Sequence, residues 1–251
     1  PEDVFMSGLT ELLKLDSEWC KADDGYSLYI RPFIFASSEW IKASSSDKFT
    51  FMIITSPTIN YYPGSIDLVI EQHFSRAANG GVGYAKAAGN YAGSFYPTKK
   101  ANARGFTQVI WTDSKEHKYI EESGTMNIWF RIDNKLITPS LSDSILGGIT
   151  RDSILKLAID AGIDVEERIV SVAEILEASK NGTLQEAFGT GTAVTVVAVK
   201  SITLEDIKMN IPTQENPISM RFKKQLQDLQ YGRSEDIFNW TSKVTSSITT
   251  F

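Results

Sequence analysis

The sequence has little of what several protein classes require. Its single cysteine, Cys20, excludes a disulfide framework and favours a reducing, intracellular setting. It has two histidines, His73 and His117, far apart in the chain, and no Cys-x-x-Cys or His-Glu-x-x-His motif, so we expect no metal site. No apolar run approaches the length of a membrane-spanning helix, and we therefore expect no association with a membrane.

Charge and composition narrow the class further. The 25 Lys and Arg residues are outnumbered by 31 Asp and Glu residues, and no basic block stands out, which argues against nucleic-acid binding. The first residues, PEDVFMSGLTELLKL, lack the basic start and continuous apolar stretch of a signal peptide. Because 42% of the 251 residues are hydrophobic, the chain can bury a core, and its length indicates one large domain or two modest ones.

The order of the predicted elements mixes strands and helices without strict alternation, which favours an α+β fold over a doubly wound one. An amphipathic helix within residues 1–15 precedes two β-rich segments, 26–36 and 48–55, and these elements are too few to close a core alone. Residues 56–65 are predicted to form a linker because they carry two prolines and a glycine. Residues 66–251 are predicted to form a large, self-sufficient domain.

Periodicity and turn residues predict the elements of this large domain. Strands are expected over 65–72, 106–112, 117–122, 125–132, 136–138, 165–170 and 192–202, and helices over 88–105, 150–162, 171–179 and 217–232. Thr150 is expected to cap its helix and Gly162 to end it, while Ser171 and Glu174 have the spacing of a capping box.

Four segments carry candidate chemistry, although each alone has an ordinary structural explanation. The small neighbours of Lys86 in GGVGYAKAAGNY allow a crowded setting, in which a lysine becomes nucleophilic. The helix start LGGITR (146–151) and the expected tight turn GTGTA (189–193) can offer N–H groups to an anion, and EESGTMN (121–127) can offer a carboxylate to a protonated ring nitrogen. Together these are the groups that pyridoxal 5′-phosphate requires.

Longer motifs, in order along essentially the whole chain, resemble the branched-chain amino-acid aminotransferases of the fold-type IV pyridoxal-phosphate class. They are SLYIRPFIF, INYYPGS, GGVGYAKAAGNYAGSF, EESGTMNIWF, ITPSLSDSILGGITRDSI, VEERIV, EAFGTGTA, IPTQENPISMRF and LQDLQYGR. The resemblance implies the D-amino-acid-aminotransferase-like fold, with a large mixed-sheet or pseudo-barrel domain. It also implies a small α/β domain that is mostly missing, with residues 1–55 as its remnant.

The activity that the resemblance implies is transfer of amino groups between leucine, isoleucine or valine and 2-oxoglutarate, giving branched-chain 2-oxo acids and glutamate. It further implies pyridoxal 5′-phosphate as cofactor, a homodimer, and an intracellular location in the cytoplasm or mitochondria. Two alternatives stay open. One is another fold-type IV enzyme, such as a D-amino-acid aminotransferase or an aminodeoxychorismate lyase. The other is a truncated, non-catalytic fragment.

The resemblance also assigns roles around the cofactor. Lys86 matches the Schiff-base lysine, Tyr91 matches the tyrosine that hydrogen-bonds the phenolic oxygen, and Glu122 matches the acid that faces the pyridine nitrogen. The adjacent Glu121 is the alternative to Glu122, and alignment to SGTMN favours Glu122. The further cofactor contacts that it implies are Arg76 near the cofactor, Thr125 with Asn127 supporting the ring, Ile149 and Thr150 at the phosphate, and Thr192 as a phosphate or carboxylate donor.

The substrate side is assigned in the same way. The N–H groups of Thr192 and Ala193 match the donors to the substrate α-carboxylate. Tyr29 and Arg31 match residues of the substrate pocket, where Arg31 would pair with the side-chain carboxylate of glutamate. Some members carry Cys-x-x-Cys after the GTGTA turn, but residues 194–197 here are Val-Thr-Val-Val, which excludes a thiol switch at that place.

Overall fold

The computed structural model describes residues 1–21, 23–59 and 62–244. The chain divides into two compact units, one of Pro1–Tyr61 with Asp236–Phe251 and one of Tyr62–Glu235. The division falls inside the predicted linker. Residues 236–244 group with the N-terminal unit, whereas the predicted large domain includes them.

The N-terminal unit is a helix packed on a hairpin. Helix α1 (Glu2–Asp16) and a short 3-10 turn precede strands β1 (Ser27–Ala36) and β2 (Phe49–Thr58), which pair antiparallel from Ser27↔Thr58 onward. The rings of Phe5 and Phe51 lie 5.8 Å apart and join the helix to the hairpin. None of the described residues of this unit is buried, which agrees with the expectation that its elements are too few to close a core.

The large unit is built around one mixed sheet, and this confirms the predicted α+β class. Its strands are β3 (Ile66–Ile70), β4 (Gln108–Thr112), β5 (Tyr119–Ser123), β6 (Asn127–Ile132), β7 (Lys135–Pro139), β8 (Val165–Arg168), β9 (Val170–Ser171), β10 (Leu184–Gly191), β11 (Thr195–Leu204) and β12 (Ile207–Asn210). The strand order is β8-β7-β6-β10-β11-β3-β4-β5-β9, with β12 on β11. The pairs β11·β3, β3·β4 and β7·β8 are parallel and the others antiparallel.

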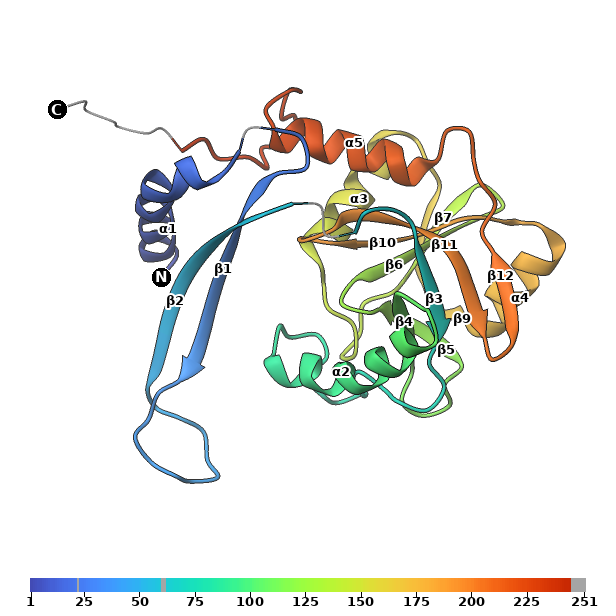
Figure 1. The fold of residues 1–251 in the computed structure, drawn as a ribbon, viewed down its shortest axis with the longest axis horizontal. Coiled ribbons are helices and arrows are strands. Elements are labelled where there is room, and N and C mark those ends of the chain that lie inside the picture. The colour runs from blue at the N-terminus through green and yellow to red at the C-terminus, as the bar shows by residue number, and fades with distance from the viewer. Residues whose placement is uncertain (22, 60–61, 245–251) are drawn as a thin grey trace. The chain divides into compact units, whose positions relative to one another are not determined.

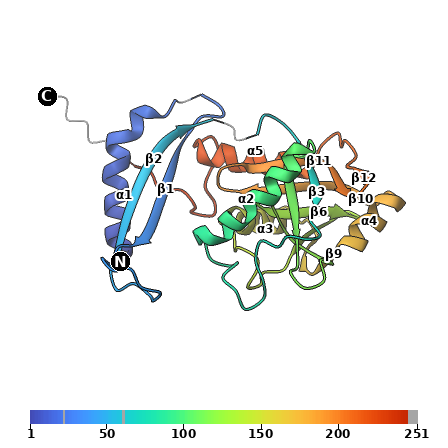
Figure 2. The same ribbon diagram turned by 60° about the horizontal axis from the view of Figure 1, so that its bottom comes forward.

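Four helices of the large unit confirm the predicted helices. They are α2 (Ala88–Ala103), α3 (Ile149–Asp160), α4 (Val172–Asn181) and α5 (Ile218–Gln230). Helix α2 packs against β4, while α5 packs against β10 and β11, and the two helices lie on different sides of the strands (Figures 1 and 2). No helix among the residues described above is long and apolar enough to cross a bilayer.

Local signals at the helix ends were mostly correct. Gly162 has a φ of +68° at the end of α3, and the Ser171 side chain accepts the N–H of Glu174, as the capping spacing predicts. The prediction that Thr150 caps α3 is wrong. Gly148 occupies the N-cap and Thr150 lies in the first turn, because the helix begins at Ile149, two residues before the start that a Thr150 cap would give.

Two strands, β10 and β12, were not predicted. Strand β10 was missed because Gly189 and Gly191 were interpreted as a tight turn, but they end the strand, and the turn is Thr192–Val194. Gly189 is needed in β10 for packing: a Cβ there would lie 2.9 Å from the sulfur of Met126. The glycine therefore marks the close approach of the Met126 side chain to β10 rather than a change of direction.

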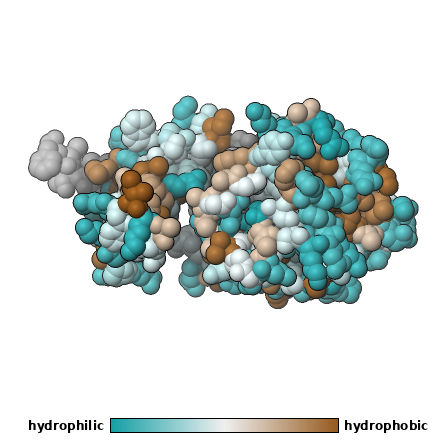
Figure 3. Space-filling view, turned by 90° about the horizontal axis from the view of Figure 1, so that it is seen from below, coloured by the Kyte–Doolittle hydropathy of each residue, from teal (hydrophilic) through white to brown (hydrophobic). Residues whose placement is uncertain are grey.

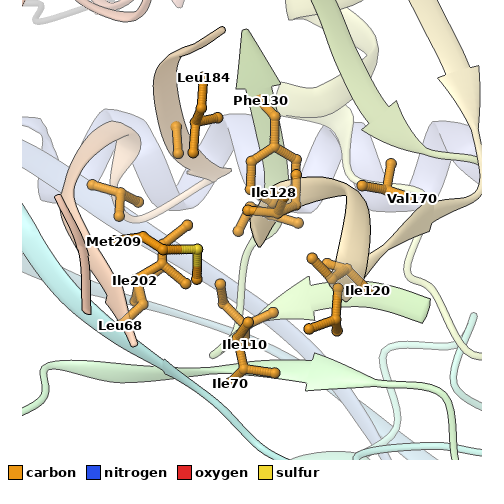
Figure 4. Close-up of a cluster of buried hydrophobic side chains, with 14 of the residues drawn as sticks. Leu68, Ile70, Ile110, Ile120, Ile128, Phe130, Val170, Leu184, Ile202 and Met209 are labelled. Carbon is orange, nitrogen blue, oxygen red and sulfur yellow. The ribbon is translucent and has the colours of Figure 1, made fainter. Parts of the chain in front are cut away.

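The core of the large unit lies where alternate residues of several strands meet. Leu68 and Ile70 of β3, Ile110 of β4, and Ile128 and Phe130 of β6 converge with residues of the neighbouring elements (Figure 4). Burial of large side chains of this kind contributes roughly 1.5–3 kcal/mol each. The face seen in Figure 3, in contrast, mixes hydrophilic and hydrophobic residues over both units.

Candidate active site

A glycine-rich loop, residues 76–87, forms the second part of the connection from β3 to α2. It lies against another loop, residues 143–148, that leads into α3. The N–H of Tyr84 donates to the carbonyl of Asp143 at 2.9 Å, and the N–H of Gly80 donates to the Asp143 carboxylate at 3.1 Å. The two backbones touch at Gly83, where a Cβ would lie 2.6 Å from the Cα of Ser144. Glycine is required there because any side chain would separate the two loops.

Lys86 lies at the junction of the glycine-rich loop and α2. Asn90, which is buried, donates its amide to the carbonyls of Val82 at 2.8 Å and Ala85 at 3.1 Å and so fastens the loop to the first turn of the helix. The Nζ of Lys86 lies 4.8 Å from the ring centroid of Tyr91. Lys86 is exposed, so the structure shows the ordinary solvated setting rather than the crowded one that its small neighbours would also allow.

A glycine pair tests whether the loop contact matters for Lys86. Gly83→Ala is expected to lower the affinity for pyridoxal 5′-phosphate, the cofactor that the sequence motifs imply, about 10-fold, because overpacking two apposed backbones costs about 1–3 kcal/mol. Gly89→Ala is the matched control: it lies in α2 with nothing within 4 Å of the added Cβ. The measurement is titration of the cofactor by absorbance, with a thermal melt of each variant. Equal affinities for the two variants would show that the contact at Gly83 does not position Lys86.

Glu122, on β5, is a buried carboxylate held from two sides. Its side chain is 4% exposed, with Oε2 3.0 Å from the Nε of Arg76, and its Oε1 accepts the N–H of Leu146 at 2.7 Å. Burial raises the pKa of Glu122 to about 7, although the charge of Arg76, the Leu146 N–H and the charge of Lys86 all favour the ionised form. Glu122 can therefore take up or release a proton near neutral pH.

Arg76 connects Glu122 to both loops. Its Nη2 donates to the carbonyl of Gly83 at 3.1 Å and to the carbonyl of Ser144. The guanidinium, only 6% exposed, thus joins the glycine-rich loop, the 143–148 loop and β5. The structure brings Arg76, Lys86, Tyr91 and Glu122 into one region, and the roles assigned to them stay predictions.

The start of α3 lies beside this region. Gly148, at the N-cap, provides no side-chain cap, so the first N–H groups of the helix, at Ile149 and Thr150, have no side-chain acceptor there. Asn127 on β6 donates to the carbonyl of Leu146 at 2.8 Å and fixes the approach to the helix. Such a helix start has the donors and the dipole that favour an anion.

The remaining predicted residues of the large unit lie in two adjacent turns. Thr125 is exposed in the turn closed by Ser123 and Met126. A Cβ on Gly191 would lie 3.8 Å from the carbonyl oxygen of Thr125, so the turn that holds Thr192 and Ala193 is next to it. Both Thr192 and Ala193 are exposed.

Tyr29 and Arg31 lie on β1 of the N-terminal unit. The guanidinium carbon of Arg31 lies 4.9 Å from the ring centroid of Tyr29, and Arg31 is exposed. Their assignment to a substrate pocket stays a prediction.

Three contributors had no signal in the sequence. The carbonyl of Ser144 and the N–H of Leu146 are backbone groups, which residue types do not report. Asn90 lies inside a segment dominated by small residues and was not singled out, although its amide fixes the loop before Lys86. A buried asparagine at a loop–helix junction is a signal that could be sought in similar sequences.

Comparison with known proteins places this arrangement in a family. Residues 2–202 match the family model described as amino-transferase class IV, and the chain belongs to that family. It is 40% identical over 248 residues to branched-chain-amino-acid transaminase 1 of Bacillus subtilis, an alignment that covers 97% of this chain and 70% of that protein.

Solved structures agree on the fold. The branched-chain amino-acid aminotransferase of Escherichia coli matches with a TM-score of 0.78 and 26% identity, covering 98% of this chain and 77% of that one. The branched-chain aminotransferase of Thermobaculum terrenum in its PLP-bound holo form matches with a TM-score of 0.66 and 24% identity, covering 82% of this chain and 65% of that one. The fold-type IV architecture implied by the sequence motifs is thereby confirmed.

Proposed function

We propose that this chain is a pyridoxal-phosphate-dependent transaminase that exchanges amino groups between branched-chain L-amino acids and 2-oxoglutarate. The observation that carries the proposal is the pairing of an accessible Lys86 with a buried Glu122 that titrates near neutral pH, in a class IV aminotransferase. The 40% identity to the Bacillus subtilis transaminase supports the choice of substrates.

The residues present fit pyridoxal 5′-phosphate. An aldehyde needs an amine, which Lys86 offers, and a pyridine nitrogen needs an acid, which Glu122 offers with lone pairs beyond those used by Arg76 and Leu146. A phosphate needs N–H donors, which the start of α3 offers at Ile149 and Thr150 without a competing side-chain cap. When bound, this cofactor supplies an electron sink for charge that develops at the substrate Cα.

The chain's own residues would supply the proton transfers. In its neutral form, the Nζ of Lys86 would accept the proton from the substrate Cα and release it again later in the cycle. Glu122 would face the ring nitrogen of the cofactor, and its raised pKa would let it share a proton with that atom. Arg76 keeps that carboxyl fixed in place through contacts to two loops.

The substrate-binding part of the proposal rests on backbone donors and on the N-terminal unit. The N–H groups of Thr192 and Ala193, two exposed residues, are proposed to bind the α-carboxylate. Tyr29 and Arg31 are proposed to contact the side chain, with Arg31 pairing with glutamate. A homodimer belongs to the same proposal and is tested by light scattering.

The test is borohydride reduction of the purified chain with pyridoxal 5′-phosphate, followed by peptide mapping, and then an assay of leucine with 2-oxoglutarate. We expect one stable adduct, on Lys86, and formation of glutamate. Activity confined to D-amino acids would overturn the choice of substrate. An adduct scattered over several exposed lysines, or none, would favour a non-catalytic fragment.

A further inference from the structure

The pairing of strand β5 with β4 is irregular at the two acidic residues of β5, Glu121 and Glu122. Trp111 of β4 pairs with Glu122, but Thr112, the next residue, pairs with Ile120, so Glu121 is an extra residue in β5. This is a β-bulge, which lets consecutive side chains leave their usual alternation to opposite faces. Bulges of this kind re-aim side chains next to functional sites.

The bulge lets both acids reach the same loop. Glu122 accepts the N–H of Leu146 at 2.7 Å, and Glu121 accepts the hydroxyl of Ser144, two residues earlier, at 2.5 Å. All three residues that make these contacts through a side chain or its loop are more than nine-tenths buried: Glu121 is 8%, Glu122 3% and Ser144 0% exposed. In a regular strand the two carboxylates would point to opposite faces, and one of these contacts would be lost.

Ser144 then links Glu121 to Glu122. Its hydroxyl donates to Glu121, while its carbonyl accepts a hydrogen bond from Arg76, whose Nε lies 3.0 Å from Glu122. The segment from Ser144 to Leu146 therefore meets Glu122 twice, once through Arg76 and once through the Leu146 N–H. Fixing Ser144 fixes both groups that hold Glu122.

We propose that Glu121 is a positioning residue for Glu122, acting through the hydroxyl of Ser144. The bulge, the short Ser144–Glu121 hydrogen bond and the Arg76–Ser144 contact form one connected network around the buried acid. Its use in catalysis rests on the function proposed above. The hydrogen-bond network is present in the cofactor-free protein, so its role can be tested in that form of the protein.

The experiment is amide hydrogen exchange at Leu146, followed by NMR in the cofactor-free chain. Glu121→Ala and Ser144→Ala are each expected to speed this exchange about 10-fold, since each removes the hydrogen bond between Ser144 and Glu121 that fixes the segment leading to Leu146. The double variant is expected to exchange no faster than the faster single variant, because both changes remove the same hydrogen bond between Ser144 and Glu121. Glu121→Gln keeps an acceptor oxygen for Ser144 and should stay within about threefold of the parent chain.

Ser153→Ala is the matched control, since the hydroxyl of this half-buried residue donates within α3, to the carbonyl of Ile149, and not to Glu121 or Glu122. Its Leu146 exchange should be unchanged. The proposal is overturned if Leu146 exchange is unaffected in both single variants, if the two effects add in full, or if Glu121→Gln behaves as Glu121→Ala.

The unmodified parent chain distinguishes a failure of the proposed enzyme function from a failure of the proposed role of Glu121. If that chain forms no Lys86 adduct with pyridoxal 5′-phosphate, the enzyme assignment fails while the exchange results still decide the role of Glu121. If the adduct forms, Glu121→Ala should retain it and lose turnover, because the lysine linkage does not require an oriented Glu122. Rescue of turnover by Glu121→Gln would then assign the loss to the hydrogen bond, and lack of rescue would contradict it.

Discussion

Replacing Lys86 by alanine is expected to abolish transamination. The value of kcat/KM for leucine with 2-oxoglutarate should fall by ~10⁴-fold or more, because the variant lacks both the covalent attachment group and the base for the Cα proton. The glycine-rich loop and Tyr91 remain in place, so the cofactor can still dock without being linked. The measurement is glutamate formation, with borohydride mapping of the same sample to show that the modified lysine is gone.

Two matched variants test whether the loss of turnover comes from the missing amine of Lys86, from the loss of its positive charge, or from the loss of any exposed lysine. Lys86→Arg keeps a cation beside Tyr91 but cannot form the linkage, and it should be as inactive as the alanine variant. Lys99→Ala removes an exposed lysine of α2 and should leave turnover unchanged. Turnover of Lys86→Ala within about tenfold of the parent chain would assign the general-base role, which accounts for roughly 10²–10⁴-fold, to another amine.

The sequence was sufficient where structure depends on local periodicity or on ordered motifs. The helices α2 to α5 follow from apolar spacing and end signals, such as Gly162 at φ +68°. The motifs around Lys86 and Glu122 pointed to a family, and the family match bears this out. Their order along the chain carried more information than any one motif, since each alone had an ordinary structural explanation.

Features that depend on pairing between distant residues were not predictable. The glycines of β10 resembled a turn because the packing of Met126 against Gly189 is invisible in a linear pattern. The bulge at Glu121 depends on the register of β4 with β5, so the sequence showed two adjacent acids and gave no reason why both are buried. The exposure of Lys86 likewise depends on which loops approach it and not on its small neighbours.

The other large effect concerns stability and comes from Glu122. Burial raises its pKa from the ordinary 4.5 to about 7. In the cofactor-free protein, the folded state therefore retains a proton between these pH values that the unfolded chain has already released. Because the folded state binds more protons in that window, its stability falls as the pH rises from about 4.5 to about 7. Above this window the full penalty from Glu122 is about 3 kcal/mol.

Glu122→Gln is expected to remove this penalty and the activity together. The amide is neutral at every pH, so the cofactor-free variant should be more stable than the parent chain at pH 8, by up to about 3 kcal/mol, and similar to it near pH 4. Turnover should fall by roughly 10²–10³-fold, because an amide cannot hold a proton against the ring nitrogen. The measurements are urea unfolding across this pH range and the leucine assay.

An exposed acid provides the control for this pH dependence. Glu116→Gln should differ from the parent chain by a small amount that does not grow with pH. The result that would contradict the prediction is a Glu122→Gln variant that loses stability relative to the parent chain as the pH rises. That sign would mean that the ion pair with Arg76 and the Leu146 N–H outweigh burial and hold Glu122 ionised when the cofactor is absent. Glu122 would then act on the ring nitrogen as a fixed charge, and not as a group that exchanges a proton with it.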